Sequence, residues 1–204
     1  MTIMTRRTLG ATAVALLFAT SMAAAQAPAM VRVRATIDKV DGRTLDVKAR
    51  DGAMMKVKLA DNAPVNEVVK ATLADIKQGD YIAITAMPQP DGTQKAVAIL
   101  IFPEAMRGVG EGFRPWDLEP NSTMTNATVA NEVTGNDGKT LTVKYKDGEK
   151  KVAVAENSVI VEYKKASASD LKSGQKIFVA AAKKLGDGTL EAPNVAFGDY
   201  GVWR

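Results

Sequence analysis

The chain has 204 residues, of which 46% are hydrophobic, 25% charged and 5% aromatic, and it contains no cysteine and no histidine. That composition excludes disulfide bonds, thiol catalysis, Cys/His zinc sites and any serine or cysteine nucleophile that histidine would activate. Lysine and arginine number 27 against 23 acidic residues, which gives a formal net charge of +4.

The first 25 residues predict a secretory signal peptide. Arg6 and Arg7 precede an alanine-rich apolar stretch, residues 9–22, and an Ala-Ala-Ala cleavage sequence, residues 23–25. The stretch is shorter than the roughly 17–25 residues of a spanning helix, although an uncleaved anchor is the alternative. The arginine pair also resembles a twin-arginine signal, but ordinary Sec export is favoured. We therefore expect a periplasmic protein with no membrane span after cleavage.

Cleavage after residue 25 changes the charge of the chain. It removes two arginines from the 27 basic residues and no acidic residue, which leaves 25 against 23 and a net charge of +2. A near-neutral exported chain has no electrostatic attraction to nucleic acid or to an anionic membrane surface. We therefore expect neither of these partners.

Six Asp-Gly pairs reveal an internal repeat. They stand at 41/42, 51/52 and 91/92, and again 96 residues later at 137/138, 147/148 and 187/188. The chain is therefore predicted to contain a first module, residues 26–102, a linker, residues 103–123, and a second module, residues 124–204.

Within each module apolar and polar residues alternate with the period of two that indicates strands. In the first module the pattern predicts strands over 31–38, 45–50 and 55–59, joined by tight Asp-Gly hairpins. Two more strands are predicted over 81–87 and 96–102. Their counterparts in the second module are residues 176–182 and 191–197.

Between the third and fourth strands the alternation stops. Residues 72–75 and 167–170 both fit the pattern [ST]-x-x-[DE] that begins a helix. With room for about two turns, each segment is predicted to form a short helix or a 3₁₀ turn that buries Ile76 or Leu171.

The order of elements predicts a mainly β fold of two tandem OB-like barrels. Each barrel is antiparallel, has five to six strands and carries one short helix between strands 3 and 4. Residues 96–102, from Ala96 to Phe102, are apolar on both faces. They are therefore expected to pack against the second module or against a second subunit, which would make a homo-oligomer.

The linker, residues 103–123, is rich in glycine and proline yet carries apolar and aromatic side chains. We therefore expect it to pack on the modules rather than act as a free tether. One interpretation is a binding surface, and the other is that its rings plug the barrel ends or the module interface. The candidate ligand-binding or partner-binding residues are Phe113, Arg114, Trp116, Asp117 and Trp203.

Metal chemistry receives little support from the residues. Asn136-Asp137-Gly138 lacks the glutamate that a calcium loop requires, so turn formation explains the Asp-Gly pairs. Met54 and Met55 point to opposite faces of one strand, which favours core filling over a copper site. No metal site and no cofactor is predicted, although surface carboxylates at Asp117, Glu119 or Asp199 stay open.

Catalysis and nucleic-acid binding are also disfavoured. Lys164 and Lys165 lie near Ser167 and Ser169, but helix capping accounts for that cluster better than a serine-lysine dyad does. OB-like barrels that bind nucleic acid stack bases on aromatic residues, and here the aromatic residues are few and scattered. We predict that the protein is not an enzyme.

Two pairs of repeated runs carry a resemblance. The Asp-Gly-x-Thr-Leu-x-Val-Lys runs at 41 and 137 and the Asp-(Ile/Leu)-Lys-x-Gly runs at 75 and 170 resemble exported bacterial proteins of unknown function built from tandem OB-like barrels. The linker run from Gly112 to Leu118, followed by residues 124–129, is similar to relatives that carry metal-transporter labels. The resemblance implies an accessory role near a metal transporter.

These observations predict a non-enzymatic periplasmic binding or interaction protein. Its partner, a protein or a small ligand, would meet the aromatic linker or the longer first loop of the second module, residues 129–137. The alternative is a periplasmic metal-handling accessory protein that uses carboxylates or methionines.

Overall fold

The structure is a computed structural model that describes residues 30–135, 138–155, 158–199 and 201. Within these residues the chain forms strands and short 3₁₀ turns and no α-helix. None of the helical segments described is long and apolar enough to cross a membrane. The predicted signal peptide and Trp203 lie outside the described residues. The prediction of a mainly β chain is confirmed.

The described strands run through both predicted modules and the linker. The first module contains β1 (Met30–Asp41), β2 (Thr44–Ala49), β3 (Met54–Leu59), β4 (Val65–Lys70), the turn η1 (Leu73–Asp75), β5 (Tyr81–Pro88) and β6 (Gln94–Ile101). The linker contains the turn η2 (Glu104–Met106) and β7 (Gly112–Pro115). The second module contains β8 (Thr123–Gly135), β9 (Gly138–Tyr145), β10 (Gly148–Val154), β11 (Val159–Ala166), the turn η3 (Ala168–Asp170), β12 (Lys176–Lys184), β13 (Leu190–Ala192) and β14 (Val195–Phe197).

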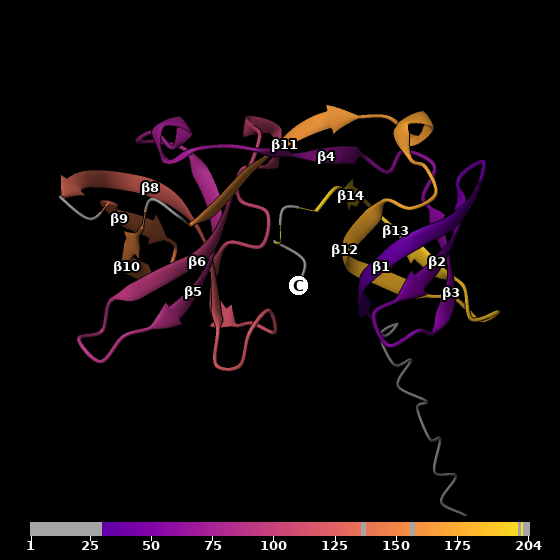
Figure 1. Cartoon of the computed structure of the whole chain (residues 1–204), viewed down its shortest axis with the longest axis horizontal. Helices are drawn as coiled ribbons and strands as arrows, with labels where there is room; N and C mark the ends of the chain where they lie inside the picture. The colour runs from indigo at the N-terminus through magenta and orange to yellow at the C-terminus, as the bar shows by residue number, and fades with distance from the viewer. Residues whose placement is uncertain (1–29, 136–137, 156–157, 200, 202–204) are drawn as a thin grey trace, which may run out of the picture.

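Strand pairing closes two circuits of five strands each. In the first barrel the order is β1-β2-β3-β13-β12, and β12 pairs with β1 to close it. In the second barrel the order is β8-β9-β10-β6-β5, and β5 pairs with β8. All of these pairs are antiparallel except β3–β13 and β10–β6, which are parallel. Figure 1 shows the two barrels side by side, with the first barrel on the right.

Each barrel is built from both modules. The first barrel takes β1, β2 and β3 from the first module and β12 and β13 from the second, and the second barrel has the reverse composition. The predicted tandem arrangement, in which each module closes on itself, is therefore not confirmed. The cause is that β4 and β11 are extended strands that carry the chain from one barrel to the other. They pair antiparallel, from Lys70 opposite Val161 to Val65 opposite Ala166, and run along the top of Figure 1.

The two segments predicted to be a short helix or a 3₁₀ turn form 3₁₀ turns of three residues, so the helix itself is not confirmed. The Asp75 carboxylate accepts the Thr72 N–H at 2.8 Å, and the Asp170 carboxylate accepts the Ser167 N–H at the same distance. The predicted burial of Ile76 and Leu171 is confirmed, because they are 0% and 4% exposed. These two side chains follow the exchange of strands between the barrels. Ile76 of the first module lies in the core of the second barrel, and Leu171 of the second module lies in the core of the first.

Strand β6 is covered on both faces, as its apolar sequence predicts. Ile99 lies in the core of the second barrel, whereas Ala98 and Leu100 lie in an apolar cluster between the barrels. The strand pairs with β10 and β11 of the second module. Burial against the second module is therefore confirmed, and a homo-oligomer through Ala96 to Phe102 stays a prediction.

The counterpart of β6 in the second module is interrupted. β13 and β14 occupy the positions 96 residues after β6, and Pro193 stands between them. Proline has no N–H for a strand ladder, so the pairing stops there. β13 then pairs with β3, and β14 pairs with β4. The first barrel is therefore bordered at the junction by two short strands, β13 and β14, whereas the second barrel has the continuous strand β6 there.

Candidate ligand-binding site

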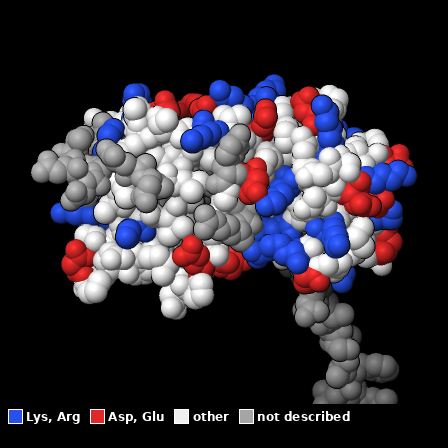
Figure 2. Space-filling view, viewed as in Figure 1, with Lys and Arg blue, Asp and Glu red and all other residues white. Residues whose placement is uncertain are grey.

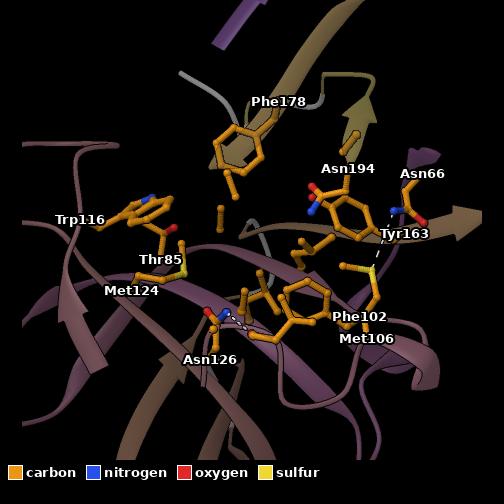
Figure 3. Close-up of a pocket in the computed structure, with 18 of the residues that line it drawn as sticks. Asn66, Thr85, Phe102, Met106, Trp116, Met124, Asn126, Tyr163, Phe178 and Asn194 are labelled. Atoms are coloured by element: carbon orange, nitrogen blue, oxygen red, sulfur yellow. Dashed lines mark hydrogen bonds between the residues drawn. The ribbon is translucent and has the colours of Figure 1, made fainter. Parts of the chain in front are cut away.

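A pocket of about 160 Å³ lies between the two barrels. One wall comes from β5 and β6, a second from β12 and the β13–β14 segment, and the linker and β8 close a third side. Figure 3 shows Phe178 of β12 across the pocket from Asn126 of β8, and Trp116 of the linker across from Tyr163 of β11. The pocket therefore depends on both modules and on the linker.

The two main walls come from segments that hold the same place in the two predicted modules. β5 and β12 are offset by 95 residues, and β6 and the β13–β14 segment by 96. Both members of each of five equivalent pairs line the pocket: Ala83 and Phe178, Thr85 and Ala180, Ala98 and Asn194, Ile99 and Val195, Leu100 and Ala196. The pocket thus forms where β5 and β6 of the first module face β12 and the β13–β14 segment of the second.

Aromatic rings line one side of the pocket. The Phe102 ring centroid is 5.5 Å from that of Tyr81 and 5.7 Å from that of Tyr163, the latter in an edge-to-face arrangement. Such arrangements are favourable for aromatic pairs. Burial raises the pKa of the Tyr163 phenol well above its usual range. The phenol therefore stays neutral at physiological pH and serves as a wall rather than as a base.

Buried polar side chains interrupt the apolar lining. Asn126 is 5% exposed, and its Nδ2 donates to the Val109 carbonyl oxygen at 2.9 Å. Its Oδ1 is buried without a hydrogen-bond partner among the described residues. Asn66, which is 7% exposed, places Nδ2 at 3.9 Å from the Met106 sulfur. Thr85 is also buried. Asparagine side chains thus meet the pocket from two sides.

Three guanidinium groups surround the Trp116 ring. Those of Arg32, Arg34 and Arg114 lie 4.0, 5.6 and 5.7 Å from its centroid, which is the range of cation–π contacts. Asp117 pairs with Arg32 and Arg34 of β1, each at 2.8 Å. Hydrogen bonds from Arg34, together with the positive charges of Arg34 and Arg32, hold the pKa of Asp117 well below its usual range. Figure 2 shows basic side chains gathered on the first barrel next to the junction.

The structure brings two of the predicted site residues to the pocket. Arg114 and Trp116 both line it. Arg114 lies on β7, which pairs with β8, so the sheet of the second barrel positions its side chain. Trp116 follows directly, and its N–H donates to the Ser122 carbonyl oxygen at 2.8 Å. These contacts fix the linker as the third wall.

The other predicted site residues lie elsewhere. Phe113 does not line the pocket and is 40% exposed. The Lys150 ammonium lies over the Phe113 ring, 4.4 Å from the ring centroid. Asp117 sits outside the pocket and anchors the linker to the first barrel. Trp203 is outside the described residues. Of the predicted first loop of the second module, residues 129–135 belong to β8, and residues 136–137 lie outside the described residues.

The carboxylates and methionines considered for metals are scattered. Within the part of the chain that the structure describes, no group of three Asp, Glu, His or Cys residues is placed to hold a metal ion. Asp199 pairs with Lys176. Met30 and Met54 are more than half exposed, whereas Met106 and Met124 line the pocket. The only described thioethers at the site are therefore these last two.

Sequence reasoning missed Asn126, Thr85 and Phe178. Asn126 ends a buried run, residues 122–126, in which every member except Met124 is polar. Buried polar residues need partners, so such a run within a strand was a usable signal of a polar site. Phe178 had the pattern of an ordinary strand residue and carried no such signal.

Comparison with known proteins adds no family or fold assignment. No protein-family model, no curated protein and no solved structure matches the chain.

Proposed function

We propose that the chain is a non-enzymatic periplasmic binding protein that holds a small apolar molecule in the pocket between its barrels. The observation that supports this most directly is the pocket itself, which is lined by residues of both modules and of the linker. Ligand sites are typically concave and largely apolar, with a few polar groups that orient the ligand. An engineered cavity of about 150 Å³ binds benzene, so the pocket volume suits a ligand of about one ring.

The scaffold in this proposal is a pair of OB-like barrels that have exchanged their last two strands. In the first barrel β3 runs parallel to β13 of the other module, and in the second barrel β10 runs parallel to β6. β12 closes the first barrel on β1, and β5 closes the second barrel on β8. The proposed placement in the periplasm rests on the signal-peptide pattern of residues 1–25.

Binding is favoured over catalysis by the groups that line the pocket. Burial keeps the Tyr163 phenol protonated, and an arginine is protonated at all physiological pH values. Asparagine and threonine side chains donate and accept hydrogen bonds without changing charge. These groups suit the recognition of a ligand better than proton transfer to it.

Titration with toluene tests the proposal. Isothermal titration of residues 26–204 should show one saturable site with a dissociation constant on the order of a millimolar or tighter, given the small size of this probe. In the variant Ala180→Phe, the new ring would occupy the pocket from its exposed edge. Toluene affinity should then fall by about tenfold or more, because filled space leaves no room for the probe.

Ala153→Phe is the matched control. Ala153 is also an exposed strand alanine, on β10, and does not line the pocket. Its substitution should leave toluene binding unchanged. Equal binding by the wild type and both variants would place toluene elsewhere, and absence of saturable binding would contradict the proposed function.

The metal-handling alternative has one observation in its favour, because Met106 and Met124 bring two thioethers to the pocket. Thioethers are soft ligands that suit Cu(I). Titration with Cu(I) under reducing conditions, compared between the wild type and a Met106→Leu/Met124→Leu variant, tests it. Binding that both leucines abolish would support this function, and identical binding by the two proteins would contradict it.

A further inference from the structure

One end of the pocket is polar. Arg114 Nη1 donates to the Gly110 carbonyl oxygen at 2.7 Å, and Asn126 Nδ2 donates to the adjacent Val109 carbonyl oxygen at 2.9 Å. A Cβ atom at Gly110 would lie 3.1 Å from Asn126 Nδ2 and 3.4 Å from Arg114 Nη2. The guanidinium and the carboxamide therefore converge on one point of the loop. We call Gly110, Arg114 and Asn126 the polar corner.

Asn126 brings an unused acceptor to the polar corner. The residue is 5% exposed and lines the pocket, and its Oδ1 has no hydrogen-bond partner among the described residues. A buried acceptor without a donor is unfavourable, because it has lost its hydrogen bonds to water. A ligand that donates a hydrogen bond in the pocket would remove that penalty.

Arg114 brings a cation that lacks a counter-charge. Arg32 and Arg34 share Asp117, but Arg114 forms no ion pair with any residue that the structure describes. Burial, and then the positive charge of Arg32, lower the pKa of Arg114. Partly buried charges are normally paired. A carboxylate in the pocket would supply the missing anion and accept hydrogen bonds from the guanidinium.

We propose that the ligand is a small apolar 2-hydroxy acid, an inference that rests on the proposed function. Its carboxylate accepts from Arg114, its hydroxyl donates to Asn126 Oδ1, and its apolar body packs toward Phe178. A hydroxyl suits the acceptor better than an ammonium group does, because Arg32, Arg34 and Arg114 together outnumber the single carboxylate beside them. The polar corner thus selects the head group and the rest of the pocket selects the apolar body.

Four probes that share one aromatic ring test this assignment. Mandelate carries both the carboxylate and the hydroxyl, phenylacetate only the carboxylate, benzyl alcohol only the hydroxyl, and toluene neither. Calorimetric titration of residues 26–204 should rank mandelate first and toluene last. The carboxylate should improve affinity about tenfold or more, and the hydroxyl about threefold to tenfold, as expected for charged and neutral hydrogen bonds.

Two variants assign these gains to the polar corner. Arg114→Met keeps an apolar stem and should remove the advantage of mandelate over benzyl alcohol. Asn126→Leu should remove the advantage of mandelate over phenylacetate while toluene still binds. Circular dichroism checks the fold of each variant, and if Asn126→Leu does not fold, the wild-type ranking of mandelate against phenylacetate decides.

The outcomes separate this inference from the proposed function. Equal affinity of the wild type for all four probes would overturn the 2-hydroxy acid and leave the apolar pocket standing. A carboxylate advantage that persists in Arg114→Met would likewise overturn it. Failure of every probe, toluene included, would overturn the proposed function as well.

Discussion

The two barrels have matching cores but different faces toward the pocket. Leu45 and Val47 of β2 are fully buried in the first barrel, and Leu141 and Val143 take the equivalent places in the second. At the pocket, by contrast, β5 presents Ala83 where β12 presents Phe178. A small barrel must fill its interior, and this restricts the core positions. The outer faces are free to differ, and the site lies where they do.

The linker adds a second difference between the barrels. It is held to the second barrel by the β7–β8 pairing and to the first by ion pairs of Asp117 with Arg32 and Arg34. Backbone hydrogen bonds therefore hold the linker to the second barrel, and side-chain ion pairs hold it to the first. The polar corner belongs to the side that backbone pairing holds.

The largest effect is expected from the two exchanged core residues. Ile76→Ala and Leu171→Ala should each lower the free energy of unfolding by about 2–5 kcal/mol, because each leaves a cavity in a packed barrel. Amide hydrogen exchange should be accelerated in β9 by Ile76→Ala and in β2 by Leu171→Ala. The reason is that Ile76 packs in the barrel that contains β9, and Leu171 in the barrel that contains β2. Faster amide exchange in β2 for Ile76→Ala and in β9 for Leu171→Ala would contradict the strand exchange and support a tandem arrangement.

A smaller effect is expected from Asp117→Asn. Asp117 is half exposed, so loss of its ion pairs should cost about 1 kcal/mol or less. Its pKa is lowered in the folded protein, so its contribution is fully present above the unfolded-state pKa of about 3.9 and is lost as the pH falls below it. Denaturant unfolding should show a constant gap between wild type and variant from pH 5 to 8 that narrows below pH 4.

Asp46→Asn provides the comparison for that variant. Asp46 of β2 pairs with Lys56 of β3 on the outer surface of the first barrel, away from the linker. Both substitutions should cost little stability, but only Asp117→Asn should loosen the linker and accelerate amide exchange at Trp116. Equal exchange at Trp116 in the two variants would show that the β7–β8 pairing alone holds the linker.

The strands were predictable because their sequence period is local. Alternation and Asp-Gly turns identified β1–β3, and Gly42 has the positive φ of +58° that such a turn requires. The partner of each strand was not predictable, because equivalent strands of the two modules carry the same pattern. β4 and β11 decide the exchange, and they were hidden in segments that looked like breaks in the alternation.

The pocket was predictable only in part. Arg114 and Trp116 stood out as charged and aromatic residues in a proline-rich linker, and both line the pocket. Phe113 and Asp117 had the same appearance but point to Lys150 and to Arg32 and Arg34. Which of these neighbours faces the pocket depends on how the barrels meet, and no local pattern encodes that.

Methionine methyl NMR tests ligand binding in the pocket most directly. Residues 26–204 contain six methionines, of which only Met106 and Met124 line the pocket. Addition of mandelate to protein labelled with ¹³C-methyl methionine should shift the signals of these two and leave those of Met30 and Met54 in place. Shifts at Met30 or Met54 alone, or at none of the six, would contradict binding between the barrels.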